Sequence, residues 1–191
     1  MKRRVRRGIA LLALAGMAVG CSLRLDRPPQ PALHDLGPPA ELHAPVPARW
    51  SAVTVNAPEW LKDPRIRYRL RYADPTQVRF YARDRWVAPP PDLLAQRLAG
   101  LGDGGGRYEL GIELQDFEQI FDSPGRARVL LRLRATVGEP GGTRVFGEKA
   151  LRLIRAAPRA DGIGAVEGLS RLVNEAAEQL SRWILELPPP R

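Results

Sequence analysis

Hydrophobic and polar residues alternate in several runs downstream of residue 50, and a period of two is typical of strands with one buried face. Three short runs, 53–55, 66–72 and 78–83, predict strands, and the turn sequence "ADPTQ" joins the second and third into a hairpin. The run over 129–137 is the longest, and it follows a run over 108–114 and precedes "RVFGEKALRLI". Tight turns at "DSPGR" and "EPGGT" separate these three runs, which predicts an antiparallel meander.

Two further segments place their hydrophobic residues at helical spacing. The first, "APPPDLLAQRLAGL", begins with prolines that suit a first helical turn, and the glycines of "GDGGG" end it. The second covers residues 166–187, where valine, alanine and leucine mark one face of a long helix. Consecutive strands with two helices predict an α+β domain, with a single, mostly antiparallel sheet and both helices packed on one of its faces.

The first 20 residues have the pattern of an export signal. Five basic residues precede an apolar run, Ile9 to Val19, which is too short for a comfortable bilayer span. The sequence "AVGC" that follows resembles the bacterial lipobox, in which the cysteine thiol is lipidated and the chain is cut before it, although the usual leucine is absent at Ala18. We therefore interpret residues 1–20 as a lipoprotein signal peptide and Cys21 as the lipidation site. A secretory signal without lipidation is the alternative.

The next segment, residues 21–49, is expected to be a tether. Seven prolines fall within it and leave no hydrophobic period, which is typical of a semi-stiff extended chain. The stretch "ALHDLGP", residues 32–38, is compatible with a short edge strand. The folded domain is accordingly predicted over residues 50–187, followed by a short tail, 188–191.

The formal net charge of +9 first suggests an anionic partner. Removal of residues 1–20 takes away five of the 30 basic residues and leaves 25 against 21 acidic ones, a net charge of +4. Part of the basic charge therefore belongs to the predicted export signal, which weakens the case for nucleic-acid binding. Because Cys21 is the only cysteine, a disulfide within the chain is impossible.

Arginines alternate with apolar residues in "RIRYRLRY", so that Arg67 and Arg69 share the polar face of one strand. A sheet with one solvated side is the favoured explanation, because the apolar stem of arginine suits a strand surface. A binding face for an acidic protein surface or for lipid headgroups is the alternative. Trp60 follows "NAPE" and Trp86 comes shortly before a run of prolines. Each could pack in a small core, which is favoured, or serve as an anchor for a partner. The candidate partner-binding residues are therefore Trp60, Arg67, Arg69 and Trp86.

The sequence contains no recognisable catalytic, metal-binding or cofactor-binding motif. Both histidines, His34 and His43, fall in the predicted tether, where nothing is expected to orient them. "GDGGG" lacks the lysine of a phosphate-binding loop, and "GIGAVEG" misses the spacing of a dinucleotide-binding motif. The acidic residues of "ELQDFEQIFD" are interpreted as solvated charges at a strand end. We expect a protein that is not an enzyme and that needs no cofactor or metal.

Three segments resemble the ABC-type transport auxiliary lipoprotein family in their order and spacing. They are "VNAPEWLKDPRIRYRL", "VRFYARDRWVAPPPDLLAQRL" and "ELQDFEQIFDSPGRARVLLRLRATV", and the ending "LSRWILE" of the last helix is similar too. The likeness runs over most of the predicted domain, from Trp50 to Glu186, and includes the lipobox. The chain departs from the family at "GDGGGR", where relatives usually have a longer segment with another strand.

The resemblance implies a lipid-anchored protein on the periplasmic face of the outer membrane. Such proteins accompany ABC systems of the mammalian-cell-entry (MCE) type, including the paraquat-inducible system, in lipid transport between the two membranes. The resemblance implies that the chain docks the periplasmic MCE protein, which works with a permease and an ATPase, and that it can form a homo-oligomer. Ser22 agrees with outer-membrane sorting, since aspartate at this position would signal inner-membrane retention. The alternative function is a periplasmic carrier that encloses a lipid or another small ligand.

Overall fold

The computed structural model describes residues 30–38, 49–101 and 106–188 of the chain. The predicted signal peptide, the predicted lipidation site Cys21 and the glycine-rich segment 102–105 lie outside the described residues. In the part of the chain that the structure describes, no helix has the length and apolarity needed to cross a membrane.

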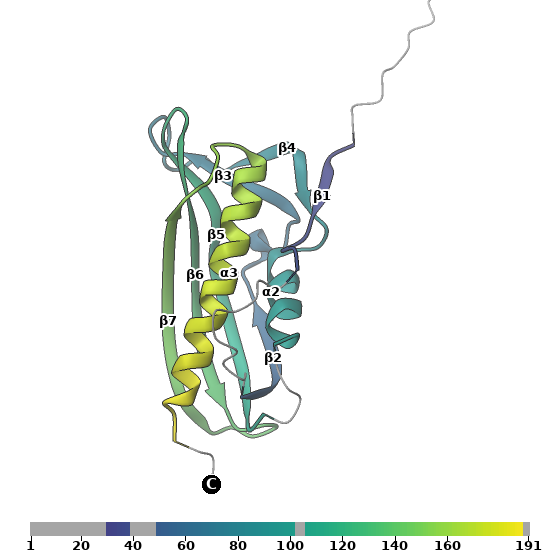
Figure 1. The fold of residues 1–191 in the computed structure, drawn as a ribbon, viewed down its shortest axis with the longest axis vertical. Coiled ribbons are helices and arrows are strands. Elements are labelled where there is room, and N and C mark those ends of the chain that lie inside the picture. Colours follow the sequence, from purple (N-terminus) through teal and green to yellow (C-terminus); the bar gives the residue numbers. More distant parts are fainter. Residues whose placement is uncertain (1–29, 39–48, 102–105, 189–191) are drawn as a thin grey trace, which may run out of the picture.

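Within these ranges the chain forms one mixed sheet of seven strands (Figure 1). The strands are β1 (Ala32–His34), β2 (Trp50–Asn56), β3 (Arg65–Leu70), β4 (Arg79–Trp86), β5 (Tyr108–Ser123), β6 (Arg126–Gly138) and β7 (Val145–Ala156). Neighbouring strands follow the order β1-β4-β3-β5-β6-β7, and β2 also pairs with β5. The longest strand, β5, therefore has β6 along one edge and both β2 and β3 along the other.

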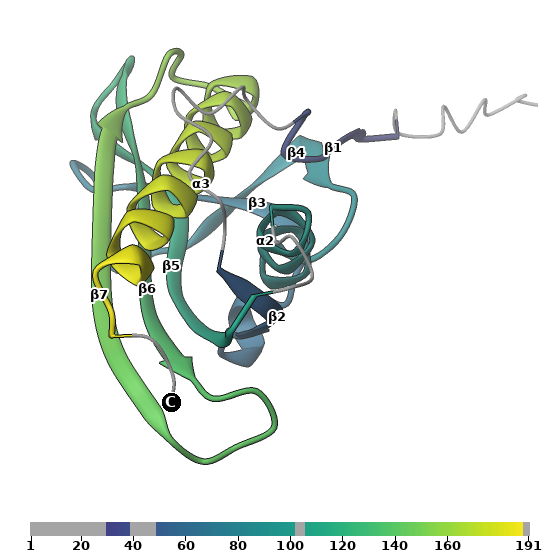
Figure 2. The same ribbon diagram turned by 60° about the horizontal axis from the view of Figure 1, so that its bottom comes forward.

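Two helices cover one face of the sheet. They are α2 (Pro90–Ala99) and α3 (Gly162–Leu185), and a short 3-10 helix, η2 (Glu59–Leu61), lies between β2 and β3 in the chain. Figure 2 shows the sheet curving around both helices, which lie on its concave side. The first turn of α3 is capped by Asp161, whose side chain accepts a hydrogen bond from the backbone N–H of Gly164 at 2.7 Å.

The predicted α+β class, with a single sheet and both helices on one face, is confirmed. The predicted hairpin is formed by β3 and β4, and the predicted meander by β5, β6 and β7, all with antiparallel pairing. Three pairings are parallel, however: β1 with β4, β2 with β5 and β3 with β5. The alternation of a strand indicates its buried face but not its partner, so these parallel pairings were not predicted.

The contact between β6 and α3 is close because Gly168 has no side chain. A Cβ atom at Gly168 would lie 2.8 Å from Cγ1 and 2.9 Å from Cγ2 of Val129, which is shorter than van der Waals contact. Val129 is fully buried, as are Leu131 and Leu133 on the same strand. The glycines of "GIGAVEG" therefore belong to a helix that starts at Gly162 and packs tightly on the sheet, which agrees with a structural role for the motif.

The folded domain extends further toward the N-terminus than the predicted boundary at residue 50. Strand β1 pairs with β4 at the edge of the sheet, which agrees with the short edge strand that "ALHDLGP" allowed. Leu36 is 6% exposed and belongs to the core, and its carbonyl oxygen accepts a hydrogen bond from Arg97 at 2.8 Å. A strand of three residues is too short to show the alternation of hydrophobic and polar residues. The prolines around β1 therefore led to the prediction of a tether.

Candidate functional site

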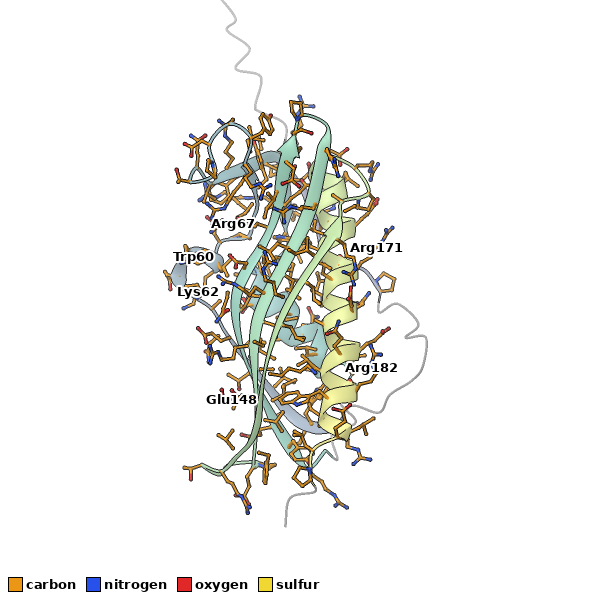
Figure 3. All side chains as sticks on the ribbon, turned by 90° about the vertical axis from the view of Figure 1, so that its left-hand side faces the viewer. Trp60, Lys62, Arg67, Glu148, Arg171 and Arg182 are labelled. Atoms are coloured by element: carbon orange, nitrogen blue, oxygen red, sulfur yellow. The ribbon has the colours of Figure 1, made fainter. Side chains whose placement is uncertain are left out.

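The face of the sheet opposite α2 and α3, called the open face below, carries most of the charged side chains that the sequence singled out. They are Arg67, Arg69, Asp116, Glu118, Asp122, Arg128, Arg132 and Arg134. Figure 3 shows Trp60, Lys62 and Arg67 on this side of the molecule, whereas Arg171 and Arg182 project from α3 on the other side. The alternation of β3, β5 and β6 places these residues on one face, because their neighbours in sequence face the helices.

Carboxylates and guanidinium groups pair across neighbouring strands of the open face. Arg69 Nε donates to both carboxylate oxygens of Glu118 at 2.9 Å, and Arg132 Nε lies 2.5 Å from Asp116 Oδ2. The Asp122 carboxylate contacts two guanidinium groups, those of Arg71 at 3.1 Å and Arg128 at 2.9 Å. The interpretation of these acids as solvated charges at a strand end was wrong, because β5 continues through them and each of these three has an arginine partner.

Arg67 is the most unusual of these residues, because it is a cation that is only 7% exposed. Its Nη1 donates to the backbone carbonyl oxygen of Trp60 at 2.8 Å, and its guanidinium carbon lies 4.5 Å from the centre of the Trp60 ring. Its Nε has no hydrogen-bond partner among the described residues. Burial disfavours the charged form of both Arg67 and its neighbour Glu118. It therefore lowers the pKa of the Arg67 guanidinium, and it raises the pKa of the Glu118 carboxyl despite the attraction of Arg69.

A break in strand pairing explains why Arg67 is buried here. Pairing of β2 with β5 ends at Glu113, and pairing of β3 with β5 begins at Gln119. Helix η2 lies at this break, where it contacts β5. Trp60, the middle residue of η2, stacks with Arg67. Buried polar backbone needs partners, and the Arg67 guanidinium supplies one of them.

The break forms a shallow hollow on the open face. Its lining residues are Asn56, Ala57, Pro58, Trp60, Glu113, Gln115 and Arg132. Trp60 is 49% exposed and is one of the few large hydrophobic side chains that the described surface leaves open to solvent. The hollow therefore combines an exposed indole ring with Arg132, which is paired with Asp116, and with the carboxylate of Glu113. Such an arrangement is suited to binding a protein surface.

Of the four candidate partner-binding residues, the structure brings three together. Trp60 lines the hollow, the buried Arg67 stacks with it, and Arg69 follows on the same face of β3, where it is engaged by Glu118. Trp86 lies elsewhere, on the helix side of the sheet, where it is 2% exposed and its ring centre is 5.7 Å from that of Phe117. This position favours the core role for Trp86 over the partner-binding role.

Two polar side chains with structural roles went unrecognised in the sequence. His34 was expected to be unoriented, which is wrong, because its Nε2 lies 2.9 Å from Asp84 Oδ1 across the β1–β4 pair. Arg97 is 8% exposed and donates to Asn174 Oδ1 at 2.6 Å, which links α2 to α3. The sequence did contain a signal for Arg97, since it occupies a position on the apolar face of its helix.

Among residues 30–38, 49–101 and 106–188, no three or more His, Cys, Asp or Glu side chains cluster in a way that could hold a metal ion. The polar groups of the open face are instead joined in ion pairs that span β3, β5 and β6. The site is therefore best treated as a candidate interaction surface.

No family model and no curated protein matches the chain. Among solved structures, a DUF330-family protein from Xanthomonas campestris is 18% identical, and the match covers 70% of this chain and 81% of that one with a TM-score of 0.61. An uncharacterized protein is 12% identical over 82% of this chain and 99% of that one, with a TM-score of 0.60. A candidate lipoprotein from Caulobacter crescentus, 14% identical over 74% of this chain and 96% of that one, has a TM-score of 0.43, too low to carry an argument. The first two similarities establish that this chain shares its fold with known proteins, one of them a DUF330 member.

Proposed function

We propose that the chain is a lipid-anchored adaptor on the periplasmic face of the outer membrane. In this proposal it docks the periplasmic MCE protein of an ABC system that moves lipids between the two membranes, and it catalyses no reaction itself. The observation that carries the docking role is the exposed Trp60 at the hollow of the open face. The lipobox at Cys21 and the resemblance to the auxiliary lipoprotein family supply the anchor and the kind of partner.

The chemistry of the open face favours a protein as the partner. Tryptophan and arginine are enriched among the residues that contribute most to protein–protein binding, and such residues lie near the centre of an interface. The acids opposite the arginines neutralise much of their charge, as the pairs of Arg69 with Glu118 and Arg132 with Asp116 illustrate. A surface of paired charges around one aromatic ring suits a mixed protein surface better than a strongly anionic polymer.

A lipid anchor would allow a weak contact with the partner protein to be occupied most of the time. Each buried CH₂ group of an acyl chain contributes about 0.8 kcal/mol, and one chain alone gives only marginal membrane binding, whereas several chains hold a protein stably. An adaptor confined to one membrane leaflet meets its partner at a raised effective concentration, so that modest affinity gives high occupancy. The proposed role of the chain is therefore to hold its partner at the membrane.

The filling of the interior favours the adaptor over a lipid carrier. Leu131, Leu133, Leu172, Val173 and Leu180, which lie between the sheet and the helices, are all fully buried. A lipid could enter this layer only by displacing such side chains. Stoichiometric phospholipid in the purified protein would contradict this assignment and favour the carrier.

Substitution of Cys21 by alanine is expected to remove the protein from the outer-membrane fraction, because the thiol that carries the lipid is lost. Fractionation of cells that produce the full chain measures this. In a second variant, Ser22→Asp, the protein is expected to move to the inner-membrane fraction. Arg171→Ala, an exposed change on α3, is the control and should leave the distribution unchanged. Unchanged recovery of Cys21→Ala in the outer membrane would refute the anchor.

Substitution of Trp60 by alanine is expected to weaken binding to the MCE-domain protein about 30-fold, since a central aromatic residue contributes about 2 kcal/mol or more. Titration of the purified partner against each variant measures the dissociation constant. Tyr72→Ala is the matched control, because Tyr72 is 48% exposed and Trp60 is 49% exposed. The hollow is not the docking site if the two variants bind alike.

A further inference from the structure

We propose that the corner of the domain where β1 meets the end of β4 rests on the surface of the phospholipid membrane. This corner, called the anchor corner below, is defined by Leu33, Val87, Arg83 and Arg85. The inference rests on the proposed lipid anchor at Cys21, and it adds a second contact with the same membrane, made by the folded domain.

The anchor corner exposes two large apolar side chains side by side. Leu33 is 64% exposed and Val87 is 53% exposed, the highest and third highest values among the exposed large hydrophobic residues of the described chain. The backbone N–H of Val87 donates to the carbonyl oxygen of His34 at 2.8 Å, so both side chains belong to the same strand pair. Both also line a shallow hollow that includes Leu36 and Val166. Exposed apolar groups of this kind mark sites of protein or membrane contact.

Two arginines of this corner, Arg83 and Arg85, are available to an anionic surface. Register places Leu33 opposite Arg85, and Arg83 lies two residues earlier on β4. Neither arginine forms an ion pair within the part of the chain that the structure describes. Of the nearby carboxylates, Glu167 is paired with Arg159 and Asp63 with Arg65. Asp84 is hydrogen-bonded to His34, and Asp35 accepts from the backbone N–H of Gly37. Anionic phospholipid headgroups attract such free arginines, at about 1 kcal/mol for each.

The length of the chain before β1 keeps the anchor corner near the membrane. Cys21 precedes Ala32 by 11 residues, and 11 residues span at most about 40 Å when fully extended. The 16 residues of β5 span about 50 Å, so the domain is longer than this tether can be. Figure 1 places β1 near one end of the long axis, and the C-terminal end of α3 at the other. A lipid at Cys21 therefore holds the end with the anchor corner close to the bilayer.

A membrane surface fits these observations better than a protein partner does. Two apolar side chains with free arginines form a small contact that gains strength only when it is confined beside its target, and the tether provides that confinement. Shallow insertion of Leu33 and Val87 with the arginines at headgroup level is the usual arrangement of residues that bind a membrane interface.

The test uses the chain from residue 21 onward with Cys21→Ser, which contains every described residue and has no lipid. Binding is measured by co-sedimentation with vesicles of phosphatidylethanolamine and phosphatidylglycerol, and with vesicles of phosphatidylcholine alone. We expect stronger partitioning to the anionic vesicles. Leu33→Ser/Val87→Ser should lower the partition coefficient about tenfold, and Arg83→Ser about fivefold, the second effect disappearing in high salt.

The matched control is the double variant Val145→Ser/Leu185→Ser, at the far end of the domain. Val145 is 54% exposed and Leu185 is 38% exposed, so this pair removes similar apolar surface away from β1. It should leave partitioning unchanged. An equal loss for both double variants, or no binding of the parent chain to anionic vesicles, would overturn the inference. Because the test protein carries no lipid, either result is independent of the Cys21 fractionation experiment.

Discussion

Substitution of Trp86 by alanine is expected to lower the free energy of unfolding by about 3–5 kcal/mol. The indole ring is 2% exposed and packs against Phe117, so its removal leaves a cavity between β4 and β5 as well as the lost hydrophobic transfer energy. Chemical denaturation of the chain from residue 21 onward measures the effect as a lower midpoint with an unchanged slope.

The comparison variant is Trp60→Ala, which makes the same chemical change on the open face. Trp60 is 49% exposed and its ring stacks with Arg67, so its loss is expected to cost about 1 kcal/mol or less. The two tryptophans would thus differ in kind: one stabilises the fold, and the other is available to a partner. Equal destabilisation by both substitutions would contradict the placement of Trp60 at the surface.

The parts of the fold that the sequence predicted are those that depend on local pattern. The alternation in β6, the turn "ADPTQ" between β3 and β4, and the prolines at the start of α2 each act over a few residues. The parallel pairings of β2 and β3 with β5 depend on contacts between residues far apart in the chain. Nothing in the alternation of "SAVTVNAP" indicates that its strand lies beside residues 108–113.

The candidate site was predictable only in part, for the same reason. Strand parity places Arg67 and Arg69 on one face, as expected from "RIRYRLRY". The burial of Arg67 and its stacking on Trp60 arise from the break between two strands that share one edge of β5, and no local pattern contains that break. The His34–Asp84 contact is of the same kind, because it exists only once β1 pairs with β4.

The close packing of α3 on β6 gives a second large expected effect. Substitution of Gly168 by valine should lower the free energy of unfolding by about 3 kcal/mol, because the new side chain overlaps Val129 in a filled layer. Val129 is fully buried, and χ1 of a β-branched residue is restricted, so its side chain has little freedom to make room. Arg171→Val is the control for a β-branched residue in the same helix, and at this exposed position it should cost about 0.5 kcal/mol.

A double-mutant cycle then separates overlap from any other effect of the valine. Val129→Ala alone leaves a cavity and is destabilising, but the double variant Gly168→Val/Val129→Ala places new side-chain volume where the old has been removed. The double variant should therefore be more stable than the sum of the two single effects predicts, by about 1–3 kcal/mol. Denaturation midpoints of the four proteins measure this coupling. Strict additivity, or a Gly168→Val variant as stable as Arg171→Val, would mean that α3 and β6 do not approach each other as closely as Gly168 allows.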